Sequence, residues 1–268
     1  MIKKDIPQTI YRGDPALSRS DIFEMRKSPM HFRYALDHPR EETTAMAFGT
    51  ALHCYVLEPE KFAERYVICE KIDRRTTAGK AKLAEIDASG LIPMDEETWQ
   101  KMECMRTNIM SNKDARLLLT GEKEKSYFWT DNLSGIDLKC RPDCRTDIGA
   151  VSVIVDLKTT ADASTEGFMR SCLTYGYDLQ AAMYKQGVEL VEGKPHRFVF
   201  IAVEKDPPYA CNVLEAGELM MRKGNEDLRS YLYAIKHCKE TNNWYGYNGE
   251  SDNVNIVGLP DWLAKDYE

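Results

Sequence analysis

The sequence predicts one α/β domain, with a central mixed β-sheet flanked by helices and an N-terminal portion that is mainly helical. Helical apolar spacing dominates the first part of the 268 residues, strand-like period-two patterns follow it, and no repeat or low-complexity linker interrupts the chain. With 43% hydrophobic residues, the chain can bury a sizeable core. We expect a single domain over 1–268, comprising a helical portion at 1–120, a core at 121–240 and a tail at 241–268.

The N-terminal helices are predicted from caps and apolar runs. The segment 17–38 is expected to be helical, with Ser18 or Ser20 as its cap. Asp21 lies near the positive end of the helix dipole, and Pro29 is expected to break or restart the helix. The nearly continuous apolar run at 45–57 predicts a buried helix. Two more helices are expected at 77–89 and 95–119.

The core is predicted from strands that alternate with helices. Strands are expected at 125–131, 136–145, 151–159, 197–204 and 209–214. Helices are expected at 164–174, 177–191 and 216–240. The tail is irregular but aromatic, so it is expected to dock on the body through Trp244, Tyr245, Tyr247 and Trp262.

Charge and cysteine content narrow the class of protein. A formal charge of -7 argues against a protein that coats nucleic acid non-specifically, because that mode needs many cations to neutralise phosphates. The segment 71–82 nevertheless holds five basic residues against Asp73, a local charge of +4, which is either solvated surface or a binding loop. No apolar run approaches the roughly 18 residues of a membrane span, and there is no secretory h-region. The eight cysteines are scattered, so we expect an intracellular protein with reduced thiols.

The strand at 151–159 carries the most informative charges. Asp156 and Lys158 follow a run of apolar residues, and their spacing of two places both side chains on one face of a buried strand. Burying them is costly unless they are paired or bind something. A simple ion pair is one explanation. Asp143, on the neighbouring predicted strand, offers another, since two close carboxylates favour a divalent cation, and oxygen ligands favour Mg²⁺ or Mn²⁺ over zinc.

These residues carry a resemblance to a known superfamily. Pro142-Asp143 followed by Asp156-Leu157-Lys158 resembles the PD…(D/E)xK signature of the restriction-endonuclease-like nucleases. Six fragments in the same order resemble the C-terminal nuclease region of RecE, exonuclease VIII: FGTALHCYVLEPEKF, DRRTTAGK, EKSYFW, CRPD, DLKTTAD and DLQAAMY. The resemblance covers the chain from about residue 5 to its end. It implies a restriction-endonuclease-like core at 121–240.

The resemblance also implies roles for individual residues. It implies a Mg²⁺ site, with Mn²⁺ as a substitute, held by His53, Asp143, Asp156 and the Leu157 carbonyl. Lys158 matches the catalytic lysine. By itself, a histidine in an apolar helix is more often a hydrogen-bonded core residue.

Further positions match elements around such sites. Glu124 matches an acidic active-site position, although a glutamate at a strand end also suits a solvent-facing role. Gln180 and Tyr184 share a helix face and match a QxxxY element on the DNA side, where the residues alone indicate ordinary helix surface. A basic loop of the family aligns with Arg74, Arg75 and Lys80, which implies phosphate contacts without base readout.

The implied activity is a metal-dependent 5′→3′ exodeoxyribonuclease that degrades one strand of linear duplex DNA and leaves 3′ tails for recombination. The resemblance implies double-stranded DNA ends as substrate, a RecT-like single-strand annealing protein as partner, and a ring-shaped homotetramer. It also suggests a phage or prophage protein acting in the bacterial cytoplasm.

Other functions remain to be weighed against this one. A non-catalytic DNA-binding recombination scaffold would be expected to have lost Asp143, Asp156 or Lys158. A Cas4- or AddB-like nuclease needs grouped cysteines for an iron-sulfur cluster, yet only Cys211 and Cys238 follow the glutamine-tyrosine helix. The H-x-E and P-C-x-x-C pattern of a zinc deaminase is absent from the sequence.

Overall fold

A five-stranded mixed sheet forms the centre of the protein. The computed structural model describes residues 2–3, 6–38, 41–249, 254–260 and 264–265. The strand order is β10-β9-β8-β7-β4, with β8 and β9 parallel and the other neighbours antiparallel. The five strands are β4 (Glu122–Lys123), β7 (Cys144–Ile148), β8 (Val151–Thr160), β9 (Arg197–Glu204) and β10 (Cys211–Glu215). The expected α/β class and central mixed sheet are confirmed.

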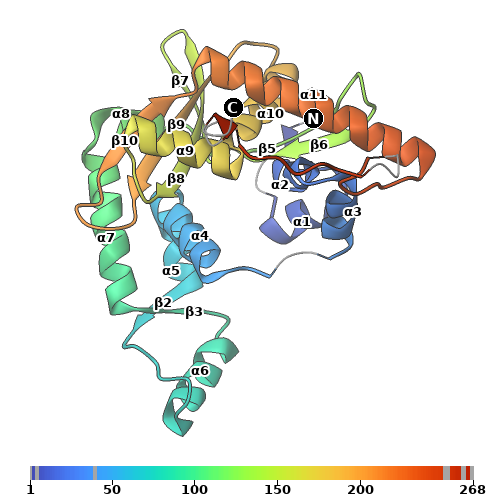
Figure 1. Ribbon diagram of the computed structural model, residues 1–268. Helices are drawn as coiled ribbons and strands as arrows, with labels where there is room; N and C mark the ends of the chain where they lie inside the picture. Colours follow the sequence, from blue (N-terminus) through green and yellow to red (C-terminus); the bar gives the residue numbers. More distant parts are fainter. Residues whose placement is uncertain (1, 4–5, 39–40, 250–253, 261–263, 266–268) are drawn as a thin grey trace.

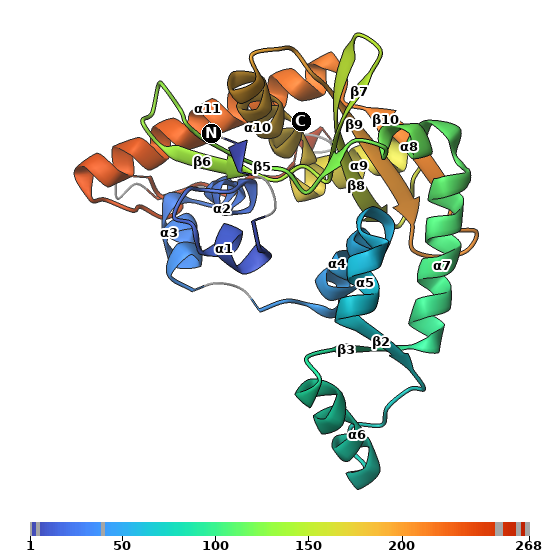
Figure 2. The same cartoon turned by 180° about the vertical axis from the view of Figure 1, so that it is seen from behind.

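Helices cover both faces of this sheet (Figures 1 and 2). On one face, alternate residues of β8 and β9 pack with α9 (Thr165–Tyr175), α10 (Tyr177–Glu192) and α11 (Glu218–Thr241). On the other face, the intervening residues pack with α4 (Thr44–Leu57) and α7 (Glu96–Ser111). Burial on both faces explains why the first half of β8 is almost continuously apolar instead of alternating.

The remaining elements surround this core. A three-stranded sheet in the order β1-β5-β6 lies beside α10; its strands are β1 (Ile2–Lys3), β5 (Ser126–Thr130) and β6 (Asp137–Cys140). The N-terminal helices are α1 (Gln8–Gly13), α2 (Arg19–Phe23), the 3₁₀ turn η1 (Glu24–Arg26) and α3 (Pro29–Asp37). Two short helices, α5 (Pro59–Arg65) and α8 (Lys113–Leu118), follow α4 and α7.

Several predicted elements are divided by local capping. The helix expected at 95–119 ends at Ser111, because the Asn112 side chain accepts hydrogen bonds from the first amides of α8. The strand expected at 136–145 is two strands, β6 and β7, which belong to different sheets. The helix expected at 17–38 restarts at Pro29, as predicted, with Ser28 as its cap.

An arm comprising residues 66–95 projects from the body (Figures 1 and 2). It consists of β2 (Tyr66–Cys69), the expected helix α6 (Thr77–Ala88) and β3 (Ile92–Asp95). β2 and β3 pair in parallel, and α6 joins them as a crossover. The two strands were not predicted, because four-residue strands with half-exposed side chains give little periodic signal.

The aromatic tail docks on α3, as expected for its first part. Trp244 stacks on Phe32 with ring centroids 5.7 Å apart, and the amide of Met30 donates to the Tyr245 carbonyl at 3.0 Å. The Tyr247 ring lies beside His31, while Trp262 falls outside the described residues.

Among the helices in the described ranges, none has the length and apolar character needed to cross a membrane.

Two helical glycines are expected to respond oppositely to alanine. A Cβ at Gly187 of α10 would lie 2.4 Å from ring carbons of Trp129, so Gly187→Ala is expected to destabilise the fold by about 1–3 kcal/mol through overpacking. Nothing lies within 4 Å of a Cβ at Gly49 of α4, so Gly49→Ala is expected to stabilise by about 0.4–1 kcal/mol. Urea denaturation measures both, and equal effects would contradict this packing.

Candidate active site

The site lies where β7 stops pairing with β8. Their ladder runs from Ile148↔Val151 to Cys144↔Val155, whereas β9 accompanies β8 as far as Thr160. The main-chain groups of Leu157 therefore have no strand partner on the β7 side. The Leu157 N–H donates instead to Asp143 Oδ2 at 2.6 Å, and its carbonyl oxygen lies 2.8 Å from His53 Nε2.

Asp143 reaches the site from the loop just before β7. The chain leaves one sheet at Cys140 and enters the other at Cys144, so Asp143 lies between the two sheets and beside Leu157. Burial raises the pKa of the Asp143 carboxyl, His53 lowers it, Asp156 raises it again, and the net pKa is above its ordinary value. This carboxylate is therefore costly to keep ionised without a cation.

Asp156 is the most deeply buried charge of the site, with 1% of its surface exposed. Its Oδ1 accepts a hydrogen bond from Gln180 Nε2 at 2.6 Å, and its Oδ2 forms an ion pair with Lys158. Oδ2 has no hydrogen bond of proper geometry, one of three such buried side-chain atoms among the described residues. A buried carboxylate oxygen in this state fits a cation ligand.

Lys158 is held as an ammonium. Burial lowers the pKa of Lys158, but Asp156, Tyr177 and Asp143 raise it by more, so the net pKa is above its ordinary value. The Nζ atom also lies 4.8 Å from the centroid of the Tyr177 ring, where the π face favours a cation. Asp156 and Lys158 thus share one face of β8, as the spacing predicts.

His53 joins the two sides of the site from α4. Its Nδ1 lies 3.6 Å from Asp143 Oδ1, while Nε2 faces the Leu157 carbonyl. A carbonyl only accepts, so Nε2 carries the proton in this arrangement. Binding a cation through Nε2 would require that proton to leave and the contact to Leu157 to open.

The donor set suits a hard divalent cation. It comprises two carboxylates, an imidazole and the Leu157 carbonyl, and it includes Asp156 Oδ2, whose partner in the structure is the Lys158 ammonium. Within the described part of the chain, no three His, Cys, Asp or Glu side chains converge closely enough to hold a metal unaided. A cation held by His53, Asp143 and Asp156 would therefore draw these side chains closer together.

Comparison with protein families shows the family of this chain. The sequence profile of the PDDEXK-like domain of unknown function (DUF3799) matches residues 18–255. The chain belongs to this PDDEXK-like family. The predicted superfamily and its restriction-endonuclease-like fold are thus confirmed, and the match does not extend to RecE itself.

One solved structure shares the fold of this PDDEXK-like chain. A crystal structure of a protein from Eubacterium rectale, described as a candidate exonuclease, aligns with a TM-score of 0.65 and 16% identity, covering 99% of this chain and 98% of that one. SSO0001 aligns with a TM-score of 0.34 and 10% identity over 85% of this chain and 79% of that one. No curated protein sequence matches the chain.

Glu124 lies beside Asp143 in a strained conformation. Its φ is 50°, and its amide donates to the Asp143 carbonyl at 3.2 Å. Burial, and then the charge of Asp143, raise the pKa of the Glu124 carboxyl to about 8. Glu124 is thus half-buried, with its main chain bonded to that of Asp143.

Glu124→Gln is expected to change the pH dependence of stability. The Glu124 carboxyl has a pKa of about 8 in the folded protein and 4.5 ordinarily, so folding favours its protonated form. The contribution of Glu124 to the free energy of unfolding is therefore complete below pH 4.5 and is lost as the pH rises through 8. The variant lacks this loss, so without metal its melting temperature should exceed that of the wild type by about 5 °C or more at pH 9, but barely at pH 5. Exposed Glu60→Gln is the control, and an equal shift at both pH values would contradict the assignment.

Gln180 and Tyr184 lie on one face of α10, as predicted. Gln180 is 4% exposed and contacts Asp156, so it is not helix surface. Tyr184 is one turn farther along and packs edge-on against Phe198, with ring centroids 6.4 Å apart. Burial raises the pKa of Tyr184 well above its ordinary value, and Asp156 contributes to the rise.

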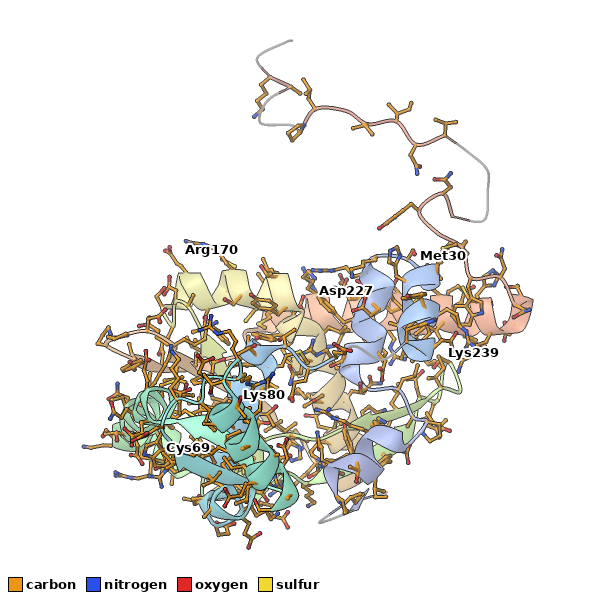
Figure 3. All side chains as sticks on the ribbon, turned by 90° about the horizontal axis from the view of Figure 1, so that it is seen from below. Met30, Cys69, Lys80, Arg170, Asp227 and Lys239 are labelled. Carbon is orange, nitrogen blue, oxygen red and sulfur yellow. The ribbon has the colours of Figure 1, made fainter. Side chains whose placement is uncertain are left out.

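The three predicted basic residues lie on the arm, apart from the carboxylates. Arg74, Arg75 and Lys80 are all exposed, and Arg75 pairs with Asp73 at 3.1 Å. Figure 3 labels Lys80 and Cys69 on this arm. The structure therefore provides two separate features, a buried acidic site and an exposed basic projection.

Arg19 and Tyr177 belong to the site but were not predicted. Arg19 Nη2 donates to Gln180 Oε1 at 3.0 Å, and Tyr177 lies beneath Lys158. No local pattern distinguishes them, because their roles depend on α2 packing against the α9–α10 turn.

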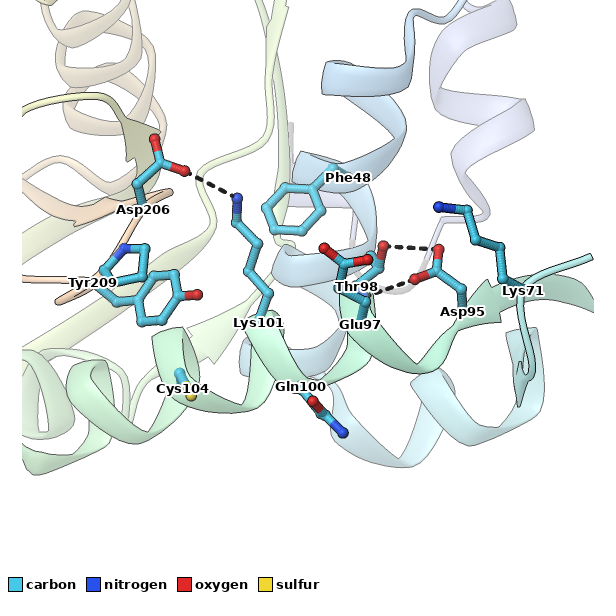
Figure 4. A pocket seen from close by; sticks show the side chains of 11 residues that line it. Phe48, Lys71, Asp95, Glu97, Thr98, Gln100, Lys101, Cys104, Asp206 and Tyr209 are labelled. Carbon is cyan, nitrogen blue, oxygen red and sulfur yellow. Dashed lines mark hydrogen bonds and ion pairs between the residues drawn. The ribbon is translucent and has the colours of Figure 1, made fainter.

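A separate cavity of about 650 Å³ opens between α7, β3 and the turn after β9 (Figure 4). Charges of both signs line it, including Lys101, which pairs with Asp206 at 3.4 Å. None of the predicted site residues lines this cavity.

Proposed function

We propose that the protein is a Mg²⁺-dependent exodeoxyribonuclease that degrades one strand of linear duplex DNA in the 5′→3′ direction. The observation that carries the proposal is the group of buried Asp143, buried Asp156 and half-buried Lys158 around Leu157, whose main chain has no strand partner on the β7 side. Buried charges of this kind destabilise a fold, so their concentration at one end of a central strand favours a catalytic role.

The proposed metal ligands are Asp143, Asp156, the Leu157 carbonyl and His53. When bound, Mg²⁺ supplies Lewis-acid polarisation of the scissile phosphate and stabilises the charge on the leaving oxygen. Mn²⁺ has the same preference for oxygen ligands and is expected to substitute.

The side chains themselves position the reactants. Lys158, kept protonated by Asp156, donates to an attacking water or a phosphate oxygen and holds it near the carboxylates. Gln180 holds Asp156 by a hydrogen bond to Oδ1, so that Oδ2 faces Lys158. His53 occupies the more open side, where its side chain is 28% exposed.

The arm is proposed to hold the duplex. Its cations project from a chain of net charge -7, which concentrates phosphate attraction at one place. Arg74, Arg75 and Lys80 offer charge without a base-reading element, which suits digestion of any sequence.

The resemblance to RecE supports the remaining parts of the proposal. These are the 5′→3′ polarity, production of 3′ tails for a RecT-like annealing partner, and assembly into a ring-shaped tetramer in the cytoplasm of a phage or prophage host. A ring around DNA would explain processive digestion, because a closed ring does not readily dissociate.

Digestion of end-labelled DNA tests the activity and its polarity together. Linear duplexes labelled at the 5′ or the 3′ end are incubated with Mg²⁺, with Mn²⁺ or with EDTA, and covalently closed circles serve as the control. We expect early release of the 5′ label, late release of the 3′ label, intact circles and no reaction in EDTA. Absence of cleavage with either metal would refute the proposal. Cleavage of the closed circles would show that the protein is an endonuclease and not an exonuclease.

A further inference from the structure

We propose that Arg19 is a positioning residue of this site, which sets the orientation of the Gln180 amide and, through it, of the Asp156 carboxylate. The inference rests on the proposed nuclease function and deepens it. It is carried by a chain of contacts from α2 through α10 to β8.

The N-terminal helices clamp the turn between α9 and α10. Arg19 Nη1 donates to the Tyr175 carbonyl at 3.1 Å, and Arg26 Nη1 donates to the Thr174 carbonyl at 3.1 Å. Gly176, with φ of 67°, lies against Phe23, where a Cβ would come within 2.2 Å of the ring. The start of α10 is therefore located by α2 and η1.

Arg19 alone extends this clamp into the site. Its second nitrogen, Nη2, donates to Gln180 Oε1 at 3.0 Å, and Gln180 Nε2 donates to Asp156 Oδ1 at 2.6 Å. A guanidinium has donors only and an ionised carboxylate has acceptors only. One amide orientation satisfies both neighbours.

The opposite amide orientation is excluded by electrostatics. A flipped Gln180 would place its oxygen against the Asp156 carboxylate and its NH₂ group against Arg19. Gln180 is 4% exposed, so water cannot readily relieve either conflict. Without Arg19, only Asp156 would orient the Gln180 amide. The hydrogen bond from Gln180 Nε2 to Asp156 Oδ1 would then weaken.

This orientation determines what Asp156 offers to the site. With Oδ1 occupied by Gln180, Oδ2 remains for Lys158 and for a cation. Arg19 thus acts on the reaction through Gln180, and it needs no direct contact with DNA to do so.

A double-mutant cycle tests the relay. Arg19→Ala, Gln180→Ala and the double variant are compared for kcat and KM on end-labelled duplex, and for Mn²⁺ affinity by electron paramagnetic resonance. Arg19→Ala is expected to lower kcat about tenfold, equivalent to one missing hydrogen bond to a charged group, with KM unchanged within about twofold. In the Gln180→Ala background it should cost nothing further. Arg19→Lys retains a donor and should recover part of the loss.

Arg26→Ala is the matched control, because Arg26 makes the same type of carbonyl contact without touching Gln180. It should leave kcat unchanged, and melting temperatures show whether either arginine merely supports the fold. Additive losses, a raised KM, or an equal loss in Arg26→Ala would overturn the relay. If the wild type cleaves no DNA, the proposed function fails by itself. The Mn²⁺ affinities then decide the relay, which predicts weaker binding in Arg19→Ala only when Gln180 is present.

Discussion

Lys158→Ala is expected to reduce phosphodiester cleavage by about a hundredfold to a thousandfold or more, the effect of removing a preorganised donor from a buried site. Asp156→Asn is expected to do the same, because it removes the charge that holds Lys158 protonated and that offers Oδ2 to a cation. Cleavage of labelled duplex under saturating Mg²⁺ measures both.

The two variants should differ in metal binding. Lys158→Ala leaves the proposed ligands in place and should still bind Mn²⁺, whereas Asp156→Asn should not. Each variant also leaves one buried charge without its partner, so melting temperatures must show that the fold persists. Lys185→Ala breaks a lysine–carboxylate pair of 2.7 Å elsewhere on α10 and is the control. Wild-type rates in a folded Lys158→Ala or Asp156→Asn protein would refute the site assignment.

Removing the charge of the arm should have the second large effect. The triple variant Arg74→Ala, Arg75→Ala, Lys80→Ala is expected to bind duplex DNA about 10- to 100-fold more weakly at low salt, since each lost phosphate contact reduces counterion release. The slope of log affinity against log salt should become shallower by up to about 2.7. Fluorescence anisotropy in EDTA measures binding without cleavage.

A second triple variant distinguishes the effect of where the basic residues lie from the effect of the net charge of the protein. Arg222, Lys236 and Lys239 lie on α11, and Lys239 is far from Lys80 in Figure 3. Their replacement by alanine changes the net charge equally and should leave affinity almost unchanged. Equal losses in the two triples would show that the arm has no special role in DNA binding.

The acidic site was predictable where local sequence and local geometry coincide. The spacing of Asp156 and Lys158 on a strand buried on both faces places them together in any sheet. Asp143 also lies near these two residues, but it lies in a loop between two sheets and not on the predicted neighbouring strand. The expected continuous strand breaks because residues 141–143 cross between sheets, and Pro142 lacks an amide for either ladder.

The surroundings of the site depend on tertiary contacts that local patterns do not contain. Arg19 acts from a five-residue helix, and its partners lie more than 150 residues away along the chain. The open side of Leu157 exists only because β7 begins at Cys144. The strands of the arm were missed because short exposed strands have no clear apolar alternation.

The most direct test of the account is an anomalous diffraction map from crystals soaked in Mn²⁺. We predict one strong peak bonded to carboxylate oxygens of Asp143 and Asp156 and to the Leu157 carbonyl, with His53 Nε2 turned from that carbonyl toward the ion. No peak at these residues under saturating Mn²⁺, or a peak elsewhere while the Asp156–Lys158 ion pair stays closed, would contradict it.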